Sequence, residues 1–440
     1  MKKIFCFVLA VMLVLSCFAG CSNAEETPET VFQATFPTVP GPADESDEAA
    51  LAYRRDLVEQ NMRDQLCVRW TPAENIEYSL VFSSKGLAAD KVSNPADIIT
   101  LRQGRIYEGI PYTHGRGSGY DFLAFATGYN DDGVLVIDGL SHSYLGGGTG
   151  SLDPLASSRI GNDCADMLFW AWAHVSTTIS FEHCKNMVPI HGCLPIGDYT
   201  GYDETLEGIY YTFPICEENG EQKMYECYAQ LQKGDGMVFM NKYGQGHAIM
   251  NVKANVVYAA DGSIDPKQSY CNILDQNSGG EREQTNAYKD EATGKIIYQL
   301  DLPDREMTFQ ELYTTGYLPI TCKELIDPSP LAEVTITDSE KEHNIDNIFK
   351  GIVNCPYRIS NVTITIKDSK GKTVQEATMF GLSNEMYDFN LARFTHDVEK
   401  TVMKGAIDLK ALESGTYIVT HTARVGNGET ITFRNFTYEK

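Results

Sequence analysis

The sequence predicts a mixed α+β unit followed by an all-β unit, in a chain of 440 residues. Three observations lead to this prediction. Before residue 200, apolar residues recur at helical spacing in several segments. After residue 200 the pattern shortens to the alternation of half-buried strands, with turn residues at Gly234, Asp235, Asp261 and Gly262. Beyond the linker-like stretch LIDPSP (325–330), β-branched residues alternate in a way typical of an antiparallel sandwich of about 110 residues.

The first residues have the pattern of an export signal. Lys2 and Lys3 precede the run IFCFVLAVMLVL, which is too short to span a membrane comfortably. The following SCFAGCS resembles the lipobox of bacterial lipoproteins, whose diacylated cysteine becomes the new N-terminus, and Cys21 is the matching position. Phe18 stands where that family prefers leucine, and ordinary secretion with cleavage near Ala24 is the alternative. We expect residues 1–21 to be a lipoprotein signal peptide, which places the protein outside the cytoplasm and anchors it to the bacterial membrane through lipid.

Composition narrows the class of the mature protein. Residues 22–48 are rich in Glu, Thr, Pro, Ala and Asp, which predicts a disordered tether, because such a segment buries too little apolar surface to fold. The net charge of −24 argues against nucleic acid as a partner. Nine cysteines follow Cys21, and their spacing shows no regular disulfide framework.

The unit predicted over 49–325 begins with helices and continues with strands. Helices are expected over 49–68 and 95–106, and a third begins near Cys164, where Asn162 and Asp163 supply N-cap oxygens. Strands are expected at GDGMVFMN, at GHAIMNVKANVVYAADGS and at YCNILDQNSGG, and a helix at TFQELYTTG closes the unit. Over 331–440 we predict an immunoglobulin-like (Ig-like) sandwich without a catalytic cluster. The strand patterns there are EVTIT, NVTITIKD, GTYIVTHTA and TITFRNFTY.

Three residues have the chemistry of a cysteine hydrolase. Cys164 lies at a helix start, where unpaired amides and the helix dipole stabilise a thiolate. His247 begins the second strand of a predicted hairpin and could take the proton. Asp275 lies on the next strand and could orient the imidazole, with Asn277 on the same face and Gln276 on the other. The alternatives are that Cys164 is a buried small apolar residue and that His247 is an ordinary surface histidine.

These residues lie in motifs that resemble a known superfamily. GNDCADMLFWAW, LQKGDGMVF and GQGHAIM resemble the NlpC-type cell-wall peptidases, and GIPYTHG is similar to their segment before the nucleophile helix. ILDQN is more similar to the related cysteine/histidine-dependent amidohydrolases. The resemblance spans roughly residues 95–280. It implies a papain-like cysteine peptidase domain, with helices packed on an antiparallel sheet and with neither cofactor nor metal.

The resemblance assigns roles to individual residues. It implies that Cys164 is the nucleophile, His247 the general base and Asp275 the third polar residue. Tyr112 matches a tyrosine that lines the cleft, and we place Asp163 and Asn277 beside it as substrate-binding residues. The Cys164 amide is the expected oxyanion donor. The implied function is cleavage of amide bonds in peptidoglycan stem peptides or cross-bridges, with the sandwich as a spacer or binding module.

Two departures from the family pattern keep a second function open. The family has Asp-Cys-Ser-Gly, whereas Ala165 and Asp166 follow the cysteine here, and Asp166 places a second carboxylate within one turn of the sulfur. About fifty residues separate Tyr112 from Cys164, a larger gap than the compact family pattern has. The alternative is therefore a catalytically inactive surface binding or adhesion lipoprotein on the same fold.

Two further features have simpler interpretations. FEHCKNMVPIHGC offers His183, Cys184, His191 and Cys193 to a zinc ion, but the spacing is irregular, and a Cys184–Cys193 disulfide or plain loop residues explain it as well. The three tryptophans are Trp70, Trp170 and Trp172. They are expected in the core or the cleft wall rather than as a platform for sugar rings.

Overall fold

The structure is a computed structural model that describes residues 34–37, 40–79, 98–113, 117–145, 160–179, 193–202, 211–243, 245–277, 286–381, 387–395 and 403–440. Within these residues it is a mixed α+β protein with several sheets, as predicted. The predicted signal peptide and Cys21 lie outside the described residues. Among the helices that are described, none is both long enough and apolar enough to cross a membrane.

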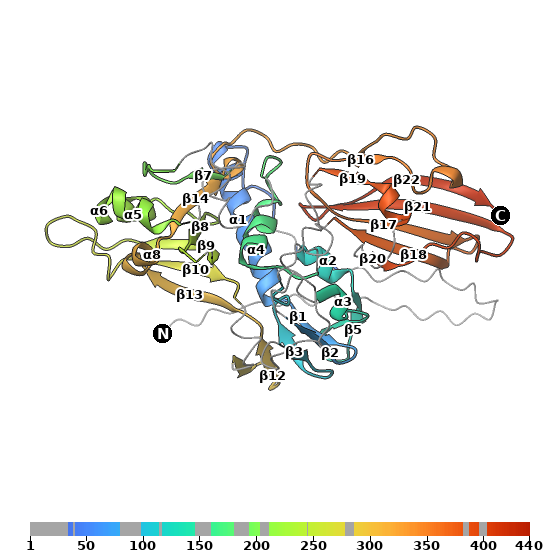
Figure 1. The fold of residues 1–440 in the computed structure, drawn as a ribbon, viewed down its shortest axis with the longest axis horizontal. Coiled ribbons are helices and arrows are strands. Elements are labelled where there is room, and N and C mark those ends of the chain that lie inside the picture. The colour runs from blue at the N-terminus through green and yellow to red at the C-terminus, as the bar shows by residue number, and fades with distance from the viewer. Residues whose placement is uncertain are drawn as a thin grey trace.

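Two helices, α1 (Asp47–Cys67) and α4 (Cys164–Trp172), lie side by side in the middle of the molecule (Figure 1). Ser46 caps α1, and Val58, Met62 and Leu66 on one face of it are almost fully buried. This confirms the helix predicted over 49–68. Every residue of α4 is buried, including Trp170 and Trp172, so the prediction that these tryptophans belong to the core is also confirmed.

A six-stranded sheet, as far as it is described, packs against one side of α4. Its strands, in spatial order, are β13 (Leu302–Thr308), β10 (Tyr270–Asp275), β9 (Gly246–Asn255), β8 (Gly236–Met240), β14 (Leu318–Cys322) and β7 (Cys193–Pro195). All neighbouring strands in it are antiparallel, and β8 and β9 form the predicted hairpin. In the described part of this region, three short helices lie between strands of the sheet in the sequence: α5 (Phe213–Asn219), α6 (Glu221–Tyr228) and α8 (Phe309–Thr315).

A second sheet was not predicted. It consists of β11 (Ala287–Lys289), β12 (Ile296–Gln299), β4 (Ile106–Glu108), β1 (Arg69–Pro72), β6 (Leu135–Ile137) and β5 (Ala126–Tyr129). Nearby lie the hairpin-like pair β2 (Ile76–Ser79) and β3 (Ile98–Leu101), and the helices α2 (Gly119–Leu123) and α3 (His142–Leu145). The helix predicted over 95–106 is wrong where this segment is described, because the residues from Ile98 to Leu101 pair antiparallel with β2. Two β-branched isoleucines and a threonine favour a strand there, and Gly104, with φ of 78°, turns the chain before β4.

The C-terminal unit is antiparallel throughout its described strands. A three-stranded sheet has the order β15 (Thr337–Asp338), β16 (Ile352–Asn354) and β19 (Asp388–Asn390). A five-stranded sheet has the order β20 (Met403–Gly405), β18 (Thr373–Phe380), β17 (Ile359–Asp368), β21 (Thr416–Val425) and β22 (Thr430–Glu439). Apolar side chains of both sheets form one core. Three 3-10 turns complete the described elements: η4 (Lys323–Leu325), η5 (Ile345–Asn347) and η6 (Leu391–Thr395).

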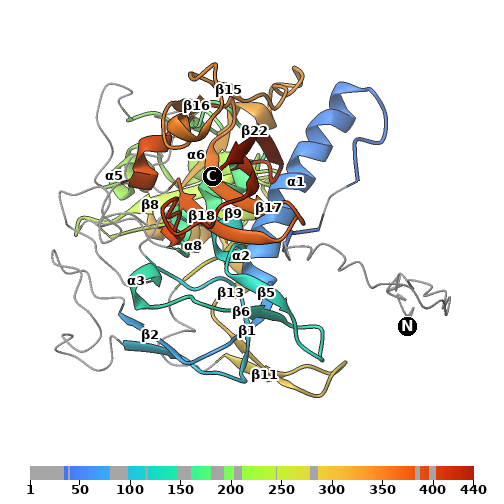
Figure 2. The same cartoon turned by 90° about the vertical axis from the view of Figure 1, so that its right-hand side faces the viewer.

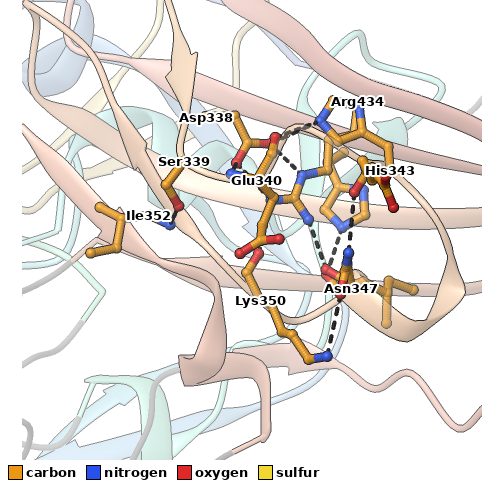
Figure 3. A network of polar contacts seen from close by, with 11 residues as sticks. Asp338, Ser339, Glu340, His343, Asn347, Lys350, Ile352 and Arg434 are labelled. Atoms are coloured by element: carbon orange, nitrogen blue, oxygen red, sulfur yellow. Dashed lines mark hydrogen bonds and ion pairs between the residues drawn. The ribbon is translucent and has the colours of Figure 1, made fainter.

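A buried arginine holds the start of this unit together. Arg434 of β22 bonds both carboxylate oxygens of Asp338, at 2.5 and 2.8 Å, and donates to the carbonyls of Asn347 and Lys350 (Figure 3). The Arg434 side chain is 0% exposed, and the Asp338 side chain 9%. One guanidinium therefore fastens the irregular 338–350 segment to the last strand. Of the predicted strand EVTIT only Thr337 is in a strand, because the residues before it have no ladder partner among the described strands.

The C-terminal unit packs directly on the region around α4. In Figure 2 this unit faces the viewer, with β17, β18 and β22 in front. The Arg358 guanidinium lies 4.9 Å from the Phe169 ring and 4.7 Å from the Trp170 ring of α4. The buried carboxylate of Asp121 in α2 accepts hydrogen bonds from Ser360 and Asn361 at the start of β17. The two units therefore share a polar and aromatic interface.

The N-terminal segment adds to this interface. Ala34 is only 5% exposed, and the Phe36 ring lies 5.3 Å from the Tyr120 ring. Residues 34–37 therefore differ from the disordered tether predicted for 22–48. Phe36 packs against Tyr120, and this contact is not visible in the local sequence pattern. The first helix, α1, begins at Asp47, two residues before the start predicted for it.

Candidate active site

Cys164 is the first residue of α4, at the position predicted for a nucleophile. The N-cap is Asp163, whose carboxylate accepts hydrogen bonds from the amides of Ala165 at 2.9 Å and Asp166 at 3.0 Å. Asn162 does not share this capping role; its side chain points into a buried polar cluster instead. Cys164 is 4% exposed and Asp166 1% exposed, so the helix start is enclosed by protein.

The GDG motif (residues 234–236), which leads into β8, holds α4 close to the sheet. The Trp172 indole donates to the Gly234 carbonyl at 2.8 Å. Asp235 binds Arg55 of α1 at 3.0 Å and accepts from the Thr321 hydroxyl at 2.7 Å. A methyl group on Gly236 would lie only 2.7 Å from Leu168. The motif therefore joins α4, α1 and the sheet at one point.

The predicted cleft segment with Tyr112 runs beside the loop that leads into Cys164. Tyr112 and Asn162 form an isolated parallel β-bridge, and the Thr113 amide donates to the Asn162 carbonyl at 2.9 Å. Gly161 allows this approach, because it has φ of 89° and a Cβ there would lie 2.5 Å from the Pro111 carbonyl oxygen. Tyr112 is half-buried against the apolar cluster of the second sheet. The segment thus lies against the residues that precede Cys164, despite its distance in the sequence.

His247 approaches Cys164 from the sheet. It is the second residue of β9, and its Nε2–H donates to Asp275 Oδ1 on β10 at 2.6 Å. The other face of the site is closed by Phe239 on β8, which pairs with His247 in the ladder and packs edge-on at 6.5 Å between ring centroids. The His247 side chain is 19% exposed and the Asp275 side chain 1%. The structure therefore brings Cys164, His247 and Asp275 together in one cluster.

The electrostatics of the cluster favour a protonated imidazole. Burial alone lowers the pKa of His247, but the charge of the Cys164 sulfur and the hydrogen bonds with Asp275 and Cys164 outweigh it. The pKa of His247 is therefore raised well above its ordinary value of 6.5. A proton is stabilised on the ring when the neighbouring sulfur is negative. This is the charge distribution that a thiolate–imidazolium pair requires.

Two residues of the site were missed by sequence reasoning. Arg305 on β13 binds the second oxygen of Asp275, with Nε and Oδ2 3.2 Å apart. Phe239, the other missed residue, forms the aromatic wall beside the imidazole. The strand pattern could have suggested Phe239, because it precedes the turn by the same interval as His247 follows it. No local pattern indicates Arg305, because its strand meets β10 only through the fold.

The remaining predicted residues have other positions. Asp163 uses one carboxylate oxygen as the helix cap, and its predicted contact with substrate stays a prediction. Asn277 lies beyond the end of β10, where its backbone amide donates to Asp301 at 3.1 Å. Four residues were considered as zinc ligands, and only Cys193 lies in the described part of the chain. It is a buried thiol on β7, opposite Cys322 of β14. Within that part, no three His, Cys, Asp or Glu side chains gather around a common point where a metal ion could bind.

Comparisons with known proteins give no further assignment. No protein-family model matches the chain, and no curated protein matches it significantly.

Proposed function

We propose that the chain is a surface-anchored cysteine hydrolase that cleaves amide bonds of peptidoglycan peptides, with Cys164, His247 and Asp275 as its catalytic residues. One observation carries the proposal: His247 binds Asp275 through Nε2 at 2.6 Å and interacts with the Cys164 sulfur as well. A nucleophile at a helix start, a base on one strand and an acid on the next strand have the roles that covalent acyl transfer needs. On the same basis we assign the nucleophile-bearing unit to the papain-like fold. We assign the C-terminal unit to an Ig-like sandwich because it has two antiparallel sheets around one core.

The reaction follows from the positions of these groups. His247 takes the proton of the Cys164 thiol, and the sulfur attacks the amide carbonyl carbon. The oxyanion that forms needs backbone donors, and the helix start supplies the Cys164 amide, whereas Asp163 occupies the amides of Ala165 and Asp166. The C–N bond then breaks, and the amine leaves with the proton from His247. Water, deprotonated by His247, hydrolyses the thioester and restores the thiol.

Asp275 and Arg305 support this sequence without contacting the carbonyl. Asp275 fixes the ring orientation and stabilises the imidazolium. Arg305 holds the second oxygen of the same carboxylate. The proposed lipid anchor at Cys21 would keep the enzyme at the membrane surface, where wall peptides are within its reach.

A second candidate function, an inactive surface binding protein, is favoured by one observation. Cys164 is only 4% exposed, and the buried Asp166 carboxylate follows it in the first helical turn, where the similar peptidases have glycine. A substrate carbonyl could then reach the sulfur only if the described surface opens.

Thiol labelling separates the two functions. Cys67 is an exposed residue, and partial desolvation of its thiol, together with nearby carboxylates, raises its pKa to about 11. Cys271 is fully buried, and burial raises its pKa to about 12. If the site is activated, iodoacetamide at pH 7 labels the nearly buried Cys164 faster than the exposed Cys67, with Cys271 as the inert control. Exposure alone would give the opposite order, and that order would favour the inactive protein.

The substrate is tested with a soluble form of the chain that begins at Ser22, after the proposed lipidation site, and that retains every described residue. Mass analysis of purified wall after incubation should show new peptide termini with this chain and none with a Cys164→Ala variant. Equal digestion by both proteins would refute the catalytic role of Cys164. Labelling of Cys164 without digestion of wall would leave the cysteine chemistry standing and refute the choice of substrate.

A further inference from the structure

Four amide side chains form a buried hydrogen-bonded chain next to the candidate site. Gln276 Nε2 donates to Asn162 Oδ1 at 2.8 Å, and Asn162 Nδ2 donates to Gln65 Oε1 at 3.0 Å. Gln65 Nε2 then donates to Asn61 Oδ1 at 2.7 Å, and the Gly119 amide donates to Gln65 Oε1 at 3.2 Å. All four amide side chains belong to residues that are no more than 4% exposed. The chain of amides therefore crosses the interior from α1 to the end of β10.

The hydrogen bond between Gln276 and Asn162 joins residues that neighbour the proposed catalytic residues in the sequence. Asn162 precedes Cys164 by two residues, and Gln276 follows Asp275 directly. Side chains alternate along an extended chain, so Asp275 points to His247 while Gln276 points to the opposite side. The Gln276–Asn162 bond thus ties the loop that presents the sulfur to the strand that presents the carboxylate.

The composition of this cluster argues against a role in stability alone. Gln276 Oε1 is buried and accepts no hydrogen bond in the described structure. An unsatisfied acceptor of this kind lowers stability, and an apolar pair of the same shape would avoid the loss. Buried polar groups are nevertheless useful where one relative position must be selected, because a hydrogen bond is directional and an apolar contact is not.

We propose that Asn162 and Gln276 are positioning residues of the candidate site, which set the Cys164 loop and the Asp275 strand at a fixed separation. The inference rests on the proposed function, because it assigns these amides to the geometry of that same site. Gln65 extends the chain to α1, so the first helix also helps to hold the nucleophile loop. Neither amide touches the substrate in this arrangement, since both side chains are fully buried.

The test replaces each amide by an apolar side chain of similar size, as Gln276→Met, Asn162→Leu and the double variant. Displacements of about 1 Å at a reacting group cost about 100-fold in rate. We expect the labelling rate of Cys164 in each single variant to fall by about 10-fold to 100-fold, and its pH profile to move. In the double variant both polar partners are gone, so resistance to urea should recover relative to the single variants. Its labelling rate should stay low if the amides position the site.

Asn251→Leu is the matched control. Asn251 is also fully buried, its amide donates to the Gln232 carbonyl at 2.9 Å, and its Oδ1 likewise accepts no hydrogen bond in the described structure. It lies on β9 but does not join the nucleophile loop to the acid strand. Its loss should lower resistance to urea while the pH profile of Cys164 labelling stays that of the wild type.

The outcomes separate the inference from the proposed function. If wild-type Cys164 is labelled no faster than Cys67, the proposed function fails and the inference fails with it. If the wild type is reactive and the Gln276 and Asn162 variants keep the pH profile of Asn251→Leu, the inference alone is refuted. Recovery of both stability and reactivity in the double variant would also refute it, because a simple packing role would then suffice.

Discussion

Gly236 is the position where one added methyl group tests the packing of α4 most directly. Its backbone does not have positive φ, so alanine introduces no conformational strain of its own. The added Cβ would lie 2.7 Å from Leu168 Cδ2 and 3.0 and 3.1 Å from two ring atoms of Trp172. Both side chains belong to α4, so the methyl group pushes directly on the helix that begins at Cys164.

The size of the effect follows from these contacts. Carbon atoms pack at about 3.5–4.0 Å, so the contact with Leu168 is too short by roughly 0.8–1.3 Å and the two contacts with Trp172 by roughly 0.4–1 Å. Overpacking of a dense core by one methyl group costs about 1–3 kcal/mol. Relief by a shift of α4 would move the sulfur relative to His247, and a misplacement of about 1 Å lowers a rate about 100-fold. We therefore expect Gly236→Ala to lose about 1–3 kcal/mol of unfolding free energy and at least about tenfold in Cys164 labelling.

Urea denaturation measures the first quantity, and iodoacetamide labelling followed by mass analysis measures the second. Gly41→Ala is the control, because a Cβ at that exposed position meets no atom within 4 Å. Wild-type stability together with wild-type labelling in Gly236→Ala would refute the reasoning. It would mean that α4 does not pack on β8 as closely as the structure places it.

Three other substitutions test the stability of the fold. Arg358→Ala removes the guanidinium that stacks on α4 and leaves a cavity, so the unfolding free energy should fall by at least about 2 kcal/mol, and a change below about 0.5 kcal/mol in urea denaturation would contradict this. Burial raises the pKa of Asp64 to about 6, so the folded state loses stability as the pH rises from 4 to 6. At pH 7 the Asp64→Asn variant should therefore be more stable than wild type by about 1–2 kcal/mol, after allowance for solvent screening. Below pH 4 the two proteins should be equally stable. Urea denaturation at the two pH values measures both differences. Arg434→Met leaves Asp338 buried without its main partner and should cost about 3–5 kcal/mol at neutral pH. Burial raises the pKa of Asp338, but the opposing interactions, with the hydrogen bonds from Arg434 first among them, outweigh burial and keep that pKa below its ordinary value. The cost of Arg434→Met should therefore shrink as the pH falls through the lowered pKa. A cost that does not change with pH would contradict the ion pair.

The sequence predicted best those elements whose burial follows a simple period. The helix at α1, the helix that begins at Cys164 and the β8–β9 hairpin all have apolar residues at regular intervals and clear turn or cap residues. The segment from Ile98 was assigned wrongly, because a short apolar run fits a helix face and a strand equally well. The segment is a strand because it pairs with β2, and the residues of the segment themselves do not indicate that partner.

Local sequence also placed the three candidate catalytic residues on the correct kinds of element, with Cys164 at a helix start and with His247 and Asp275 on successive strands. A cap residue before Cys164, a glycine before His247 and the alternation along β10 are short-range features, and they put each side chain where the structure has it. Their meeting depends on the fold. Gly236 sets the height of α4 above the sheet, and the register of β9 against β10 brings the acid to the imidazole.

By itself, the sequence determined which residues could react and on what kind of element each would lie, because capping, turn formation and side-chain alternation act over a few residues. Only the tertiary structure decided how they are held. Arg305 reaches Asp275, Gln276 reaches Asn162, and Arg358 reaches α4 across long intervals of sequence. These contacts arise because strand register and close packing select partners by shape and hydrogen-bond geometry over the whole chain, and such partners leave no periodic trace in the residues between them.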